Sequence, residues 1–283
     1  MIQIYDRQRK EIYTEEEYGK GALQFLYQTV PGRILLKLFI TRPEFSRKRA
    51  VYYRSSKSVR DIEPFIKKYH VDMTGYRMGN FRSFNDFFTR KRKVTDSSKT
   101  GELVAPADSK LAVYEITDEL KLKIKNSIYS VEDILQDKIL AEKYQGGMCL
   151  VFRLSVDDYH RFHFIDDGRI RRYYKIPGVL HTVRSISERY HVFSANAREV
   201  TVMDTAHFGE VTEVDVGALL VGKIHNRKTV SFHKLMEKGY FEYGGSTVVL
   251  LMENGVKIDS DICEMSRRGI ECKVRIGERI GGI

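Results

Sequence analysis

Tyr243-Gly244-Gly245-Ser246-Thr247-Val248-Val249-Leu250-Leu251 is the stretch that decides the fold of the larger part of this chain. Two glycines followed by an uninterrupted apolar run indicate a tight turn that enters a buried strand. Similar short runs, bounded by Gly, Asp and Asn, recur from about Leu103 onward. The clearest are Cys149 to Leu154, Glu199 to Met203, Glu213 to Val221 and Thr247 to Met252. We therefore predict a β-rich domain, barrel- or sandwich-like, over residues 101–283, with a helical insertion at Ser130 to Gln136.

Residues 1–100 carry helix signals instead. Thr14 and Glu17 form a capping box, which predicts a helix that runs to the break at Pro31-Gly32. Further helical segments are expected over Arg33 to Ile40, over Ile62 to His70 and after Ser83, where Phe84, Phe87 and Phe88 share one apolar face. The predicted fold class is therefore α+β, a helical N-terminal region followed by the β-rich domain.

Composition is that of an ordinary globular protein, since 42% hydrophobic content in 283 residues is enough to bury a core. The cysteines, Cys149, Cys263 and Cys272, are odd in number and lack metal-ligand spacing. No N-terminal stretch has the order of a signal peptide, so a reducing cytoplasm fits best. No window approaches the roughly 18 uninterrupted apolar residues of a membrane-spanning helix.

Positive charge is concentrated near the N-terminus. The net charge is +10, and residues 1–100 hold 22 of the 48 lysines and arginines but only 11 of the 38 acidic residues. Basic residues from Arg42 to Arg60, with tyrosines among them, follow the apolar segment 33–40, which is the composition of an interfacial membrane anchor. The charge therefore suggests an acidic membrane surface or a nucleic acid as partner, although a solvated basic face has the same composition.

Ser246 is a candidate nucleophile. The glycines before it open backbone conformations in which its hydroxyl reaches the carbonyl carbon of Gly245. An N-to-O acyl shift would give an ester, which eliminates to dehydroalanine and then hydrolyses, with loss of ammonia, to a pyruvoyl group. Read locally, a glycine turn entering a strand is common, so the motif by itself also fits an ordinary turn.

His160 and His163 lie three residues apart directly after an apolar strand. They could be a general base, half of a metal site or structural residues, and no recognised zinc pattern surrounds them. Asp108 lies behind a proline in a turn. Asp108, His163 and Ser246 occur along the chain in the order acid, base, nucleophile. A carboxylate that orients an imidazole, which in turn deprotonates a serine, is a known way to activate a hydroxyl.

Taken together, these stretches resemble the phosphatidylserine decarboxylase family from about Ser83 to the C-terminus. The similar segments are Phe84 to Arg90, Pro106-Ala107-Asp108, Tyr159-His160-Arg161-Phe162-His163, Phe193 to Val200, Val216 to Gly222 and Gly244-Gly245-Ser246-Thr247. There are two departures: the commonest family motif has leucine where Gly244 stands, and Ser109 replaces the usual glycine.

The resemblance implies that Asp108, His163 and Ser246 are the charge-relay set for self-cleavage between Gly245 and Ser246, with His160 assisting. The products would be a β fragment, 1–245, and an α fragment, 246–283, which stay associated. Ser246 would become the covalent pyruvoyl cofactor, which forms a Schiff base with the serine amine of phosphatidylserine and promotes loss of carbon dioxide. No metal is expected. His160 or His163 would protonate the product.

The same resemblance implies a zymogen that acts in phospholipid biosynthesis at the cytoplasmic side of the cell membrane, with residues 1–100 as the docking region and a homo-oligomer possible. Two alternatives within catalysis are a pyruvoyl decarboxylase of a soluble amino acid and a metal hydrolase that uses the two histidines. A third is a non-enzymatic basic domain that binds nucleic acid and is not cut. No nucleic acid is expected as a partner of the decarboxylase.

Overall fold

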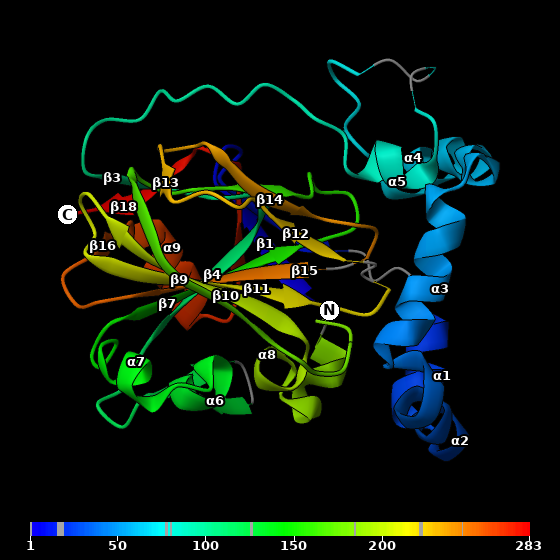
Figure 1. The fold of residues 1–283 in the computed structure, drawn as a ribbon, viewed down its shortest axis with the longest axis horizontal. Coiled ribbons are helices and arrows are strands. Elements are labelled where there is room, and N and C mark those ends of the chain that lie inside the picture. Colours follow the sequence, from blue (N-terminus) through cyan, green and yellow to red (C-terminus); the bar gives the residue numbers. More distant parts are fainter. Residues whose placement is uncertain are drawn as a thin grey trace.

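A ten-stranded sheet forms the centre of the β-rich part of the chain (Figure 1). The computed structural model describes residues 2–15, 20–76, 79, 81–124, 127–183, 185–220, 223–244 and 246–283. In spatial order the strands are β13 (Ser231–Phe232), β9 (Gly168–Ile176), β10 (Arg198–Thr205), β11 (Glu210–Gly217), β15 (Ser246–Met252), β7 (Met148–Leu154), β4 (Ser109–Glu115), β17 (Glu271–Val274), β1 (Ile2–Asp6) and β2 (Glu11–Glu15). Only β1 and β17 pair in parallel among these neighbours. The sheet is open, with β13 and β2 as its edges.

Smaller elements complete the fold. Two three-stranded sheets contain β12 (Ile224–Asn226), β14 (Glu237–Phe241) and β8 (Arg161–His163), and β16 (Lys257–Ile258), β18 (Arg279–Gly282) and β3 (Glu102–Val104). A hairpin pairs β5 (Lys121–Ile124) with β6 (Ser127–Ser130). Around the sheets lie α6 (Val131–Leu135), α7 (Lys138–Glu142), the 3-10 turn η4 (Ser185–Tyr190), α8 (Val192–Ala195) and α9 (Ser260–Arg267). The predicted cap of α6 is confirmed, because the Ser130 hydroxyl accepts a hydrogen bond from the Asp133 amide.

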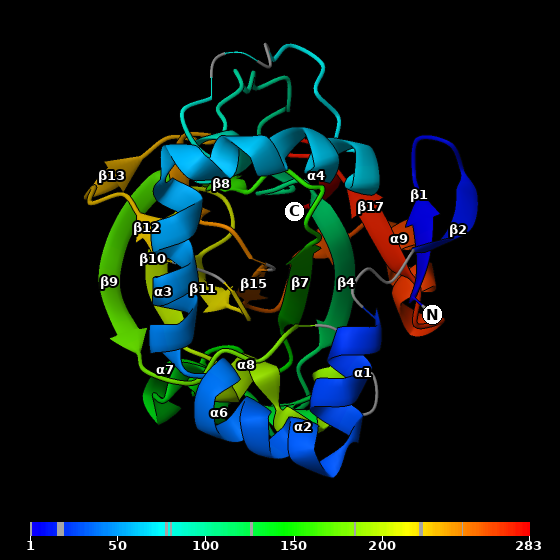
Figure 2. The same ribbon diagram turned by 90° about the vertical axis from the view of Figure 1, so that its right-hand side faces the viewer.

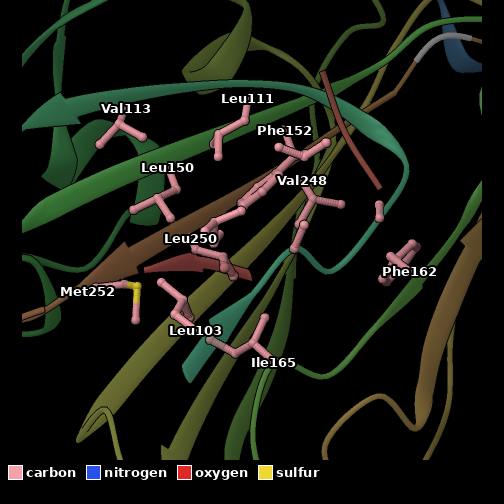
Figure 3. Close-up of a cluster of buried hydrophobic side chains, with 14 of the residues drawn as sticks. Leu103, Leu111, Val113, Leu150, Phe152, Phe162, Ile165, Val248, Leu250 and Met252 are labelled. Carbon is pink, nitrogen blue, oxygen red and sulfur yellow. The ribbon is translucent and has the colours of Figure 1, made fainter. Parts of the chain in front are cut away.

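Strand β15 is central and buried along its whole length. Val248, Leu250 and Met252 point into one apolar cluster, shown in Figure 3, whereas Val249 and Leu251 point into a second cluster on the other face. A strand covered on both faces has no polar side, which explains the uninterrupted apolar run in its sequence. The strand prediction from Thr247 onward is confirmed.

The N-terminal helices cover one side of the sheet structure (Figures 1 and 2). They are α1 (Lys20–Gln28), α2 (Val30–Leu35), the π-helical turn η1 (Leu36–Ile40), α3 (Pro43–Arg54), the 3-10 turn η2 (Ser56–Asp61), α4 (Ile62–Tyr69) and α5 (Phe84–Phe88). Three phenylalanines of α5, Phe84, Phe87 and Phe88, are buried with Phe65, as predicted. The α+β class, with a helical N-terminal region before a β-rich part, is therefore confirmed.

The N-terminal end differs from the prediction. Thr14 lies in β2 of a hairpin, Glu17 lies outside the described residues, and the first helix begins at Lys20. The hairpin forms because β1 pairs with β17, which is more than 260 residues away, so a local cap signature could not reveal it. Strand β11 also ends earlier than expected, at Gly217, and Val221 lies outside the described residues. In the described ranges, no helix is both long enough and apolar enough to cross a membrane.

Candidate active site

Ser246 begins the central strand β15. It pairs with Gly217 of β11 on one side and with Leu154 of β7 on the other. Its side chain is fully buried, and its Oγ has no hydrogen-bond partner in the described part of the chain. A buried hydroxyl without a hydrogen-bond partner lowers the stability of the folded state, so its presence points to a functional role for the residue. Gly244 has φ of +139°, a conformation closed to most side chains, and Gly245 lies outside the described residues.

His160 lies beside the turn that leads to Ser246. Its carbonyl accepts a hydrogen bond from the Phe241 amide, 3.0 Å away, and its ring lies 4.0 Å from the ring of Phe88. Phe88 in turn lies 5.2 Å from the ring of Tyr243. The Nδ1 atom of His160 is 2.9 Å from the Asp158 carbonyl oxygen, while its buried Nε2 has no partner among the described residues. Burial lowers the pKa of His160 to about 3, so the ring is neutral at ordinary pH.

His163 and Asp108 lie close together at the other end of β8. The His163 amide donates to the carbonyl of Pro106, two residues before Asp108, over 2.9 Å. Burial lowers the pKa of His163 to about 4, against the opposing charges of Glu237 and Asp108. Asp108 accepts hydrogen bonds from the Arg92 guanidinium at 2.6 Å and the Ile276 amide at 2.9 Å. Within the described ranges, no hydrogen bond joins the side chains of Asp108, His163 and Ser246.

A cavity of about 770 Å³ opens next to Ser246. Its wall includes Leu154, the register partner of Ser246, and Gly244. Apolar residues from the N-terminal helices line the opposite side: Ala22, Leu23, Leu26, Ile40 and Phe45. Figure 2 looks at this side of the molecule, with α1, α2, α3 and α4 in front and β7 and β15 behind them. The cavity thus joins the candidate nucleophile to the helical region.

Charged side chains in the cavity wall were missed by the sequence analysis. Lys110 of β4 and Arg153 of β7 are register partners, and both side chains are almost fully buried. Two like charges placed opposite one another need carboxylates between them. Lys110 Nζ lies 2.7 Å from Asp158, and Arg153 lies 2.9 Å from Glu15. The sequence did offer one signal for these residues, because a lysine and an arginine inside otherwise apolar strands need buried partners. It did not reveal Glu15 as a partner, because Glu15 is far from both in the sequence.

The metal alternative finds no ligand set in the described part of the chain. No group of three or more His, Cys, Asp or Glu side chains is arranged there to hold an ion. His160 and His163 belong instead to different surroundings, one against Phe88 and the other beside Asp108. The two imidazoles therefore fit separate proton-transfer roles better than a shared ligand role.

Comparison with known proteins gives one consistent result. A family model described as phosphatidylserine decarboxylase matches residues 84–282. Phosphatidylserine decarboxylase proenzyme 2 of Clostridium acetobutylicum is 52% identical, covering 99% of this chain and 98% of the relative. Phosphatidylserine decarboxylase proenzymes of Ruminiclostridium cellulolyticum and Clostridium novyi are 39% and 38% identical over 99% of this chain and 97% and 99% of their own lengths. The matched region contains Asp108, both histidines and Ser246.

Proposed function

The chain belongs to the phosphatidylserine decarboxylase family, and from that membership we propose that it converts phosphatidylserine to phosphatidylethanolamine after cutting itself between Gly245 and Ser246. As a family member it is an enzyme, a carboxy-lyase of phospholipid biosynthesis, whose relatives are named proenzymes. The observation that carries the self-cleavage proposal is the fully buried hydroxyl of Ser246, which has no partner among the described residues and follows Gly244, a residue of the cavity wall.

Self-cleavage uses the Ser246 hydroxyl as nucleophile. Its oxygen attacks the carbonyl carbon of Gly245, and the amide nitrogen of Ser246 leaves as an amine, which gives an ester. Removal of the Cα proton of Ser246 then expels the Gly245 carboxylate and leaves dehydroalanine, and water releases ammonia from it. A neutral imidazole is needed to take the hydroxyl proton, and we assign this role to His163 with Asp108 as its orienting carboxylate.

The residues around Ser246 fit the resulting pyruvoyl group. The position is buried, lies at the start of a central strand and is the register partner of Leu154, a residue of the cavity wall. When present, a pyruvoyl ketone condenses with the substrate amine and accepts the electrons released with carbon dioxide. The chain's own residues bind the lipid headgroup in the cavity and exclude water. His160, held against Phe88 beside the Ser246 turn, is placed to hold the proton that the product needs.

Residues 246–283 would remain bound after cleavage because their strands are interleaved with those of residues 1–245. β15 pairs with β11 and β7, β17 pairs with β4 and β1, and β18 pairs with β3. Arg153 adds an ion pair to Glu271 at 2.6 Å inside the protein. A fragment with neighbours on both sides of two strands cannot leave without opening the main sheet.

Docking on an acidic membrane surface follows from the helical region. Six large apolar side chains of α1, α2 and η1 are exposed: Phe25, Val30, Ile34, Leu35, Leu38 and Phe39. Exposed basic residues of α3, among them Arg47 and Lys48, lie next along the chain. Exposed apolar residues with basic neighbours are typical of proteins that bind the interface of acidic lipids. Residues of α1, η1 and α3 also line the cavity, which supports a substrate entrance on the side of the protein that would face the bilayer.

A denaturing gel with an activity assay tests the proposal. The wild type should give two fragments, of residues 1–245 and 246–283, and should release carbon dioxide from phosphatidylserine vesicles. Ser246→Ala should give a single chain without activity. An uncut wild type that is fully active would overturn the proposal, and so would a cut protein that decarboxylates free serine but not the lipid.

A further inference from the structure

Asp157 is a carboxylate in the cavity wall that has no direct hydrogen bond to a cation among the described residues. Its side chain is 39% exposed, and the nearest cation in the described part of the chain is Lys110, with Nζ at 3.9 Å. That distance is too long for a direct hydrogen bond. Glu15, at the end of β2, lies at the same distance from Lys110. Both carboxylates line the cavity.

The two buried cations of this wall are already occupied. Lys110 bonds directly to Asp158 at 2.7 Å, and Arg153 contacts Glu15 at 2.9 Å and Glu271 at 2.6 Å. These direct contacts leave Asp157 with no cation at hydrogen-bond distance among the described residues. A partly exposed carboxylate in a cavity wall favours a positively charged ligand.

The opposite wall carries the reverse charge. Arg49 of α3 lines the cavity and is exposed, and its guanidinium lies 5.5 Å from the ring centre of Tyr53. In the described ranges no carboxylate pairs with it. An unpaired guanidinium is a good partner for a phosphodiester, because its planar donors match two phosphate oxygens.

Strand β7 connects the Asp157 end of the cavity to the candidate nucleophile. Leu154 pairs with Ser246 across β7 and β15, and Asp157 follows Leu154 by three residues. The Ser246 hydroxyl is buried and has no partner in the described part of the chain. A ligand whose cation lies at Asp157 would therefore have that group beside residue 246, with an anion directed towards Arg49 and the helices.

We propose that Asp157, with Glu15, binds the ammonium group of the phosphoserine headgroup, and that Arg49 binds its phosphodiester. The inference rests on the proposed function and adds to it the residues that choose the headgroup. Lipids without a positive charge, such as phosphatidylglycerol, would leave Asp157 unpaired in the wall and would be disfavoured for that reason.

The test uses the processed, full-length protein and two soluble headgroups in titration calorimetry. Glycerophosphocholine has a phosphodiester and a cation that cannot condense with a ketone, and glycerophosphoglycerol has the phosphodiester alone. Asp157→Asn should reduce the affinity for glycerophosphocholine about tenfold and leave the affinity for glycerophosphoglycerol unchanged, since a hydrogen bond to a charged group contributes about that factor. Arg49→Gln should weaken both ligands by a similar factor. Asp157→Glu, which keeps the charge, should restore most of the glycerophosphocholine affinity.

Two matched controls accompany these variants. Arg47→Gln removes a charge from the same helix, and Glu264→Gln removes an exposed carboxylate of α9; neither side chain lines the cavity. Both should bind the two ligands as the wild type does. The headgroup assignment would be overturned if the Asp157→Asn protein lost the same factor of affinity for both ligands, or if it bound both ligands as tightly as the wild type does. Cleavage into two fragments and turnover of phosphatidylserine by the wild type are scored separately, so failure of the assignment is distinguishable from failure of the proposed function.

Discussion

Burial keeps His160 and His163 neutral, and this property matters more for the chemistry than their spacing does. Burial lowers their pKa values to about 3 and about 4, and each ring has a buried nitrogen without a partner among the described residues. Each imidazole is therefore unprotonated at physiological pH and has a free nitrogen that can act as a base, although its low pKa makes it a weak one. The two rings lie in different surroundings, so their roles are separable by mutation.

We expect His163→Gln to remain a single chain, because the proton acceptor beside Asp108 is lost. His160→Gln should still be cut into two fragments but should decarboxylate phosphatidylserine at least about a hundredfold more slowly, the usual loss for one proton-transfer group. Gel analysis and carbon dioxide release measure the two properties on the same samples. A cleaved His160→Gln with full activity would contradict the assignment of His160.

Protein stability should depend on pH through the same histidines. In the unfolded chain a histidine has a pKa of about 6.5, so below that pH the unfolded state takes up a proton that the folded state refuses. The stabilising contribution is therefore complete above pH 6.5 and is lost as the pH falls towards the folded values. The test measures the free energy of unfolding in urea at pH 6.5 and at pH 5.0, for the single-chain Ser246→Ala protein with and without His160→Gln. The loss of free energy between the two pH values should be about 1.5 kcal/mol smaller in the protein that also carries His160→Gln. Equal drops in both proteins would contradict this.

Sequence alone could nominate Ser246, Asp108 and the histidine pair as candidates, because each lies in a local motif, and their roles stay predictions. It could not predict Glu15, Lys110 or Arg153 in the cavity wall, since their contacts join β2, β4 and β7. A charge buried in a strand makes sense only when its partners are known. Whether a given charge is matched or left over, as for Asp157, is a property of the assembled wall.

At the scale of elements, the β1–β2 hairpin connects the N-terminus to the segment that follows the cleavage site. Arg7, at the end of β1, bonds to Asp261 and Glu278 at 2.8 Å and to Asp259 at 3.0 Å. All three carboxylates belong to residues 246–283. After cleavage the hairpin would therefore hold the small fragment by ion pairs as well as by strand pairing.

Arg7→Met should weaken the retention of the small fragment, because three partly buried carboxylates lose their common cation, at a cost of about 1 to 3 kcal/mol. Gel filtration of the cleaved protein in increasing urea measures the concentration at which the fragments separate. Arg9→Met is the matched control, since Arg9 is exposed on the same hairpin and its guanidinium pairs with Glu11, which belongs to the same hairpin. Equal separation points for the two variants would contradict the role of Arg7.

The apolar surface of α2 and η1 predicts membrane binding. Ile34→Glu with Phe39→Glu should reduce co-sedimentation with vesicles that contain phosphatidylglycerol, because each buried apolar side chain contributes about 1.5 to 3 kcal/mol. Ile139→Glu is the control, since Ile139 is exposed on α7 away from the N-terminal helices (Figure 1). Unchanged sedimentation of the double variant would contradict docking through these helices.

Several elements were predictable because their signals are local, whereas the helix break expected at Pro31-Gly32 was wrong, since both residues lie inside α2. The caps at Ser83 and Ser130, the phenylalanines of α5 and the apolar run of β15 all lie where the sequence placed them. The hairpin was not predictable, since Thr14 carries a helix-cap signature and pairs with Gln3 only because β1 has a distant partner. Tertiary pairing outweighed a local propensity there.

At the scale of the whole molecule, the fold would let the chain be cut as proposed without coming apart. The proposed cut lies at the entrance to the central strand β15, whose two neighbours, β11 and β7, belong to the other segment. The helical region supplies the apolar wall of the cavity, so the proposed cleavage, headgroup binding and membrane contact would all take place on one side of the protein.

The central claim is that Ser246 becomes a pyruvoyl group, and intact mass spectrometry of the freshly purified, denatured protein tests it most directly. The account predicts two masses, with the fragment of residues 246–283 lighter by the mass of ammonia than a fragment that begins with serine. It further predicts that mild borohydride treatment adds two hydrogens to that fragment alone. A single full-length mass from active enzyme, or a small fragment that begins with unmodified serine, would contradict the account.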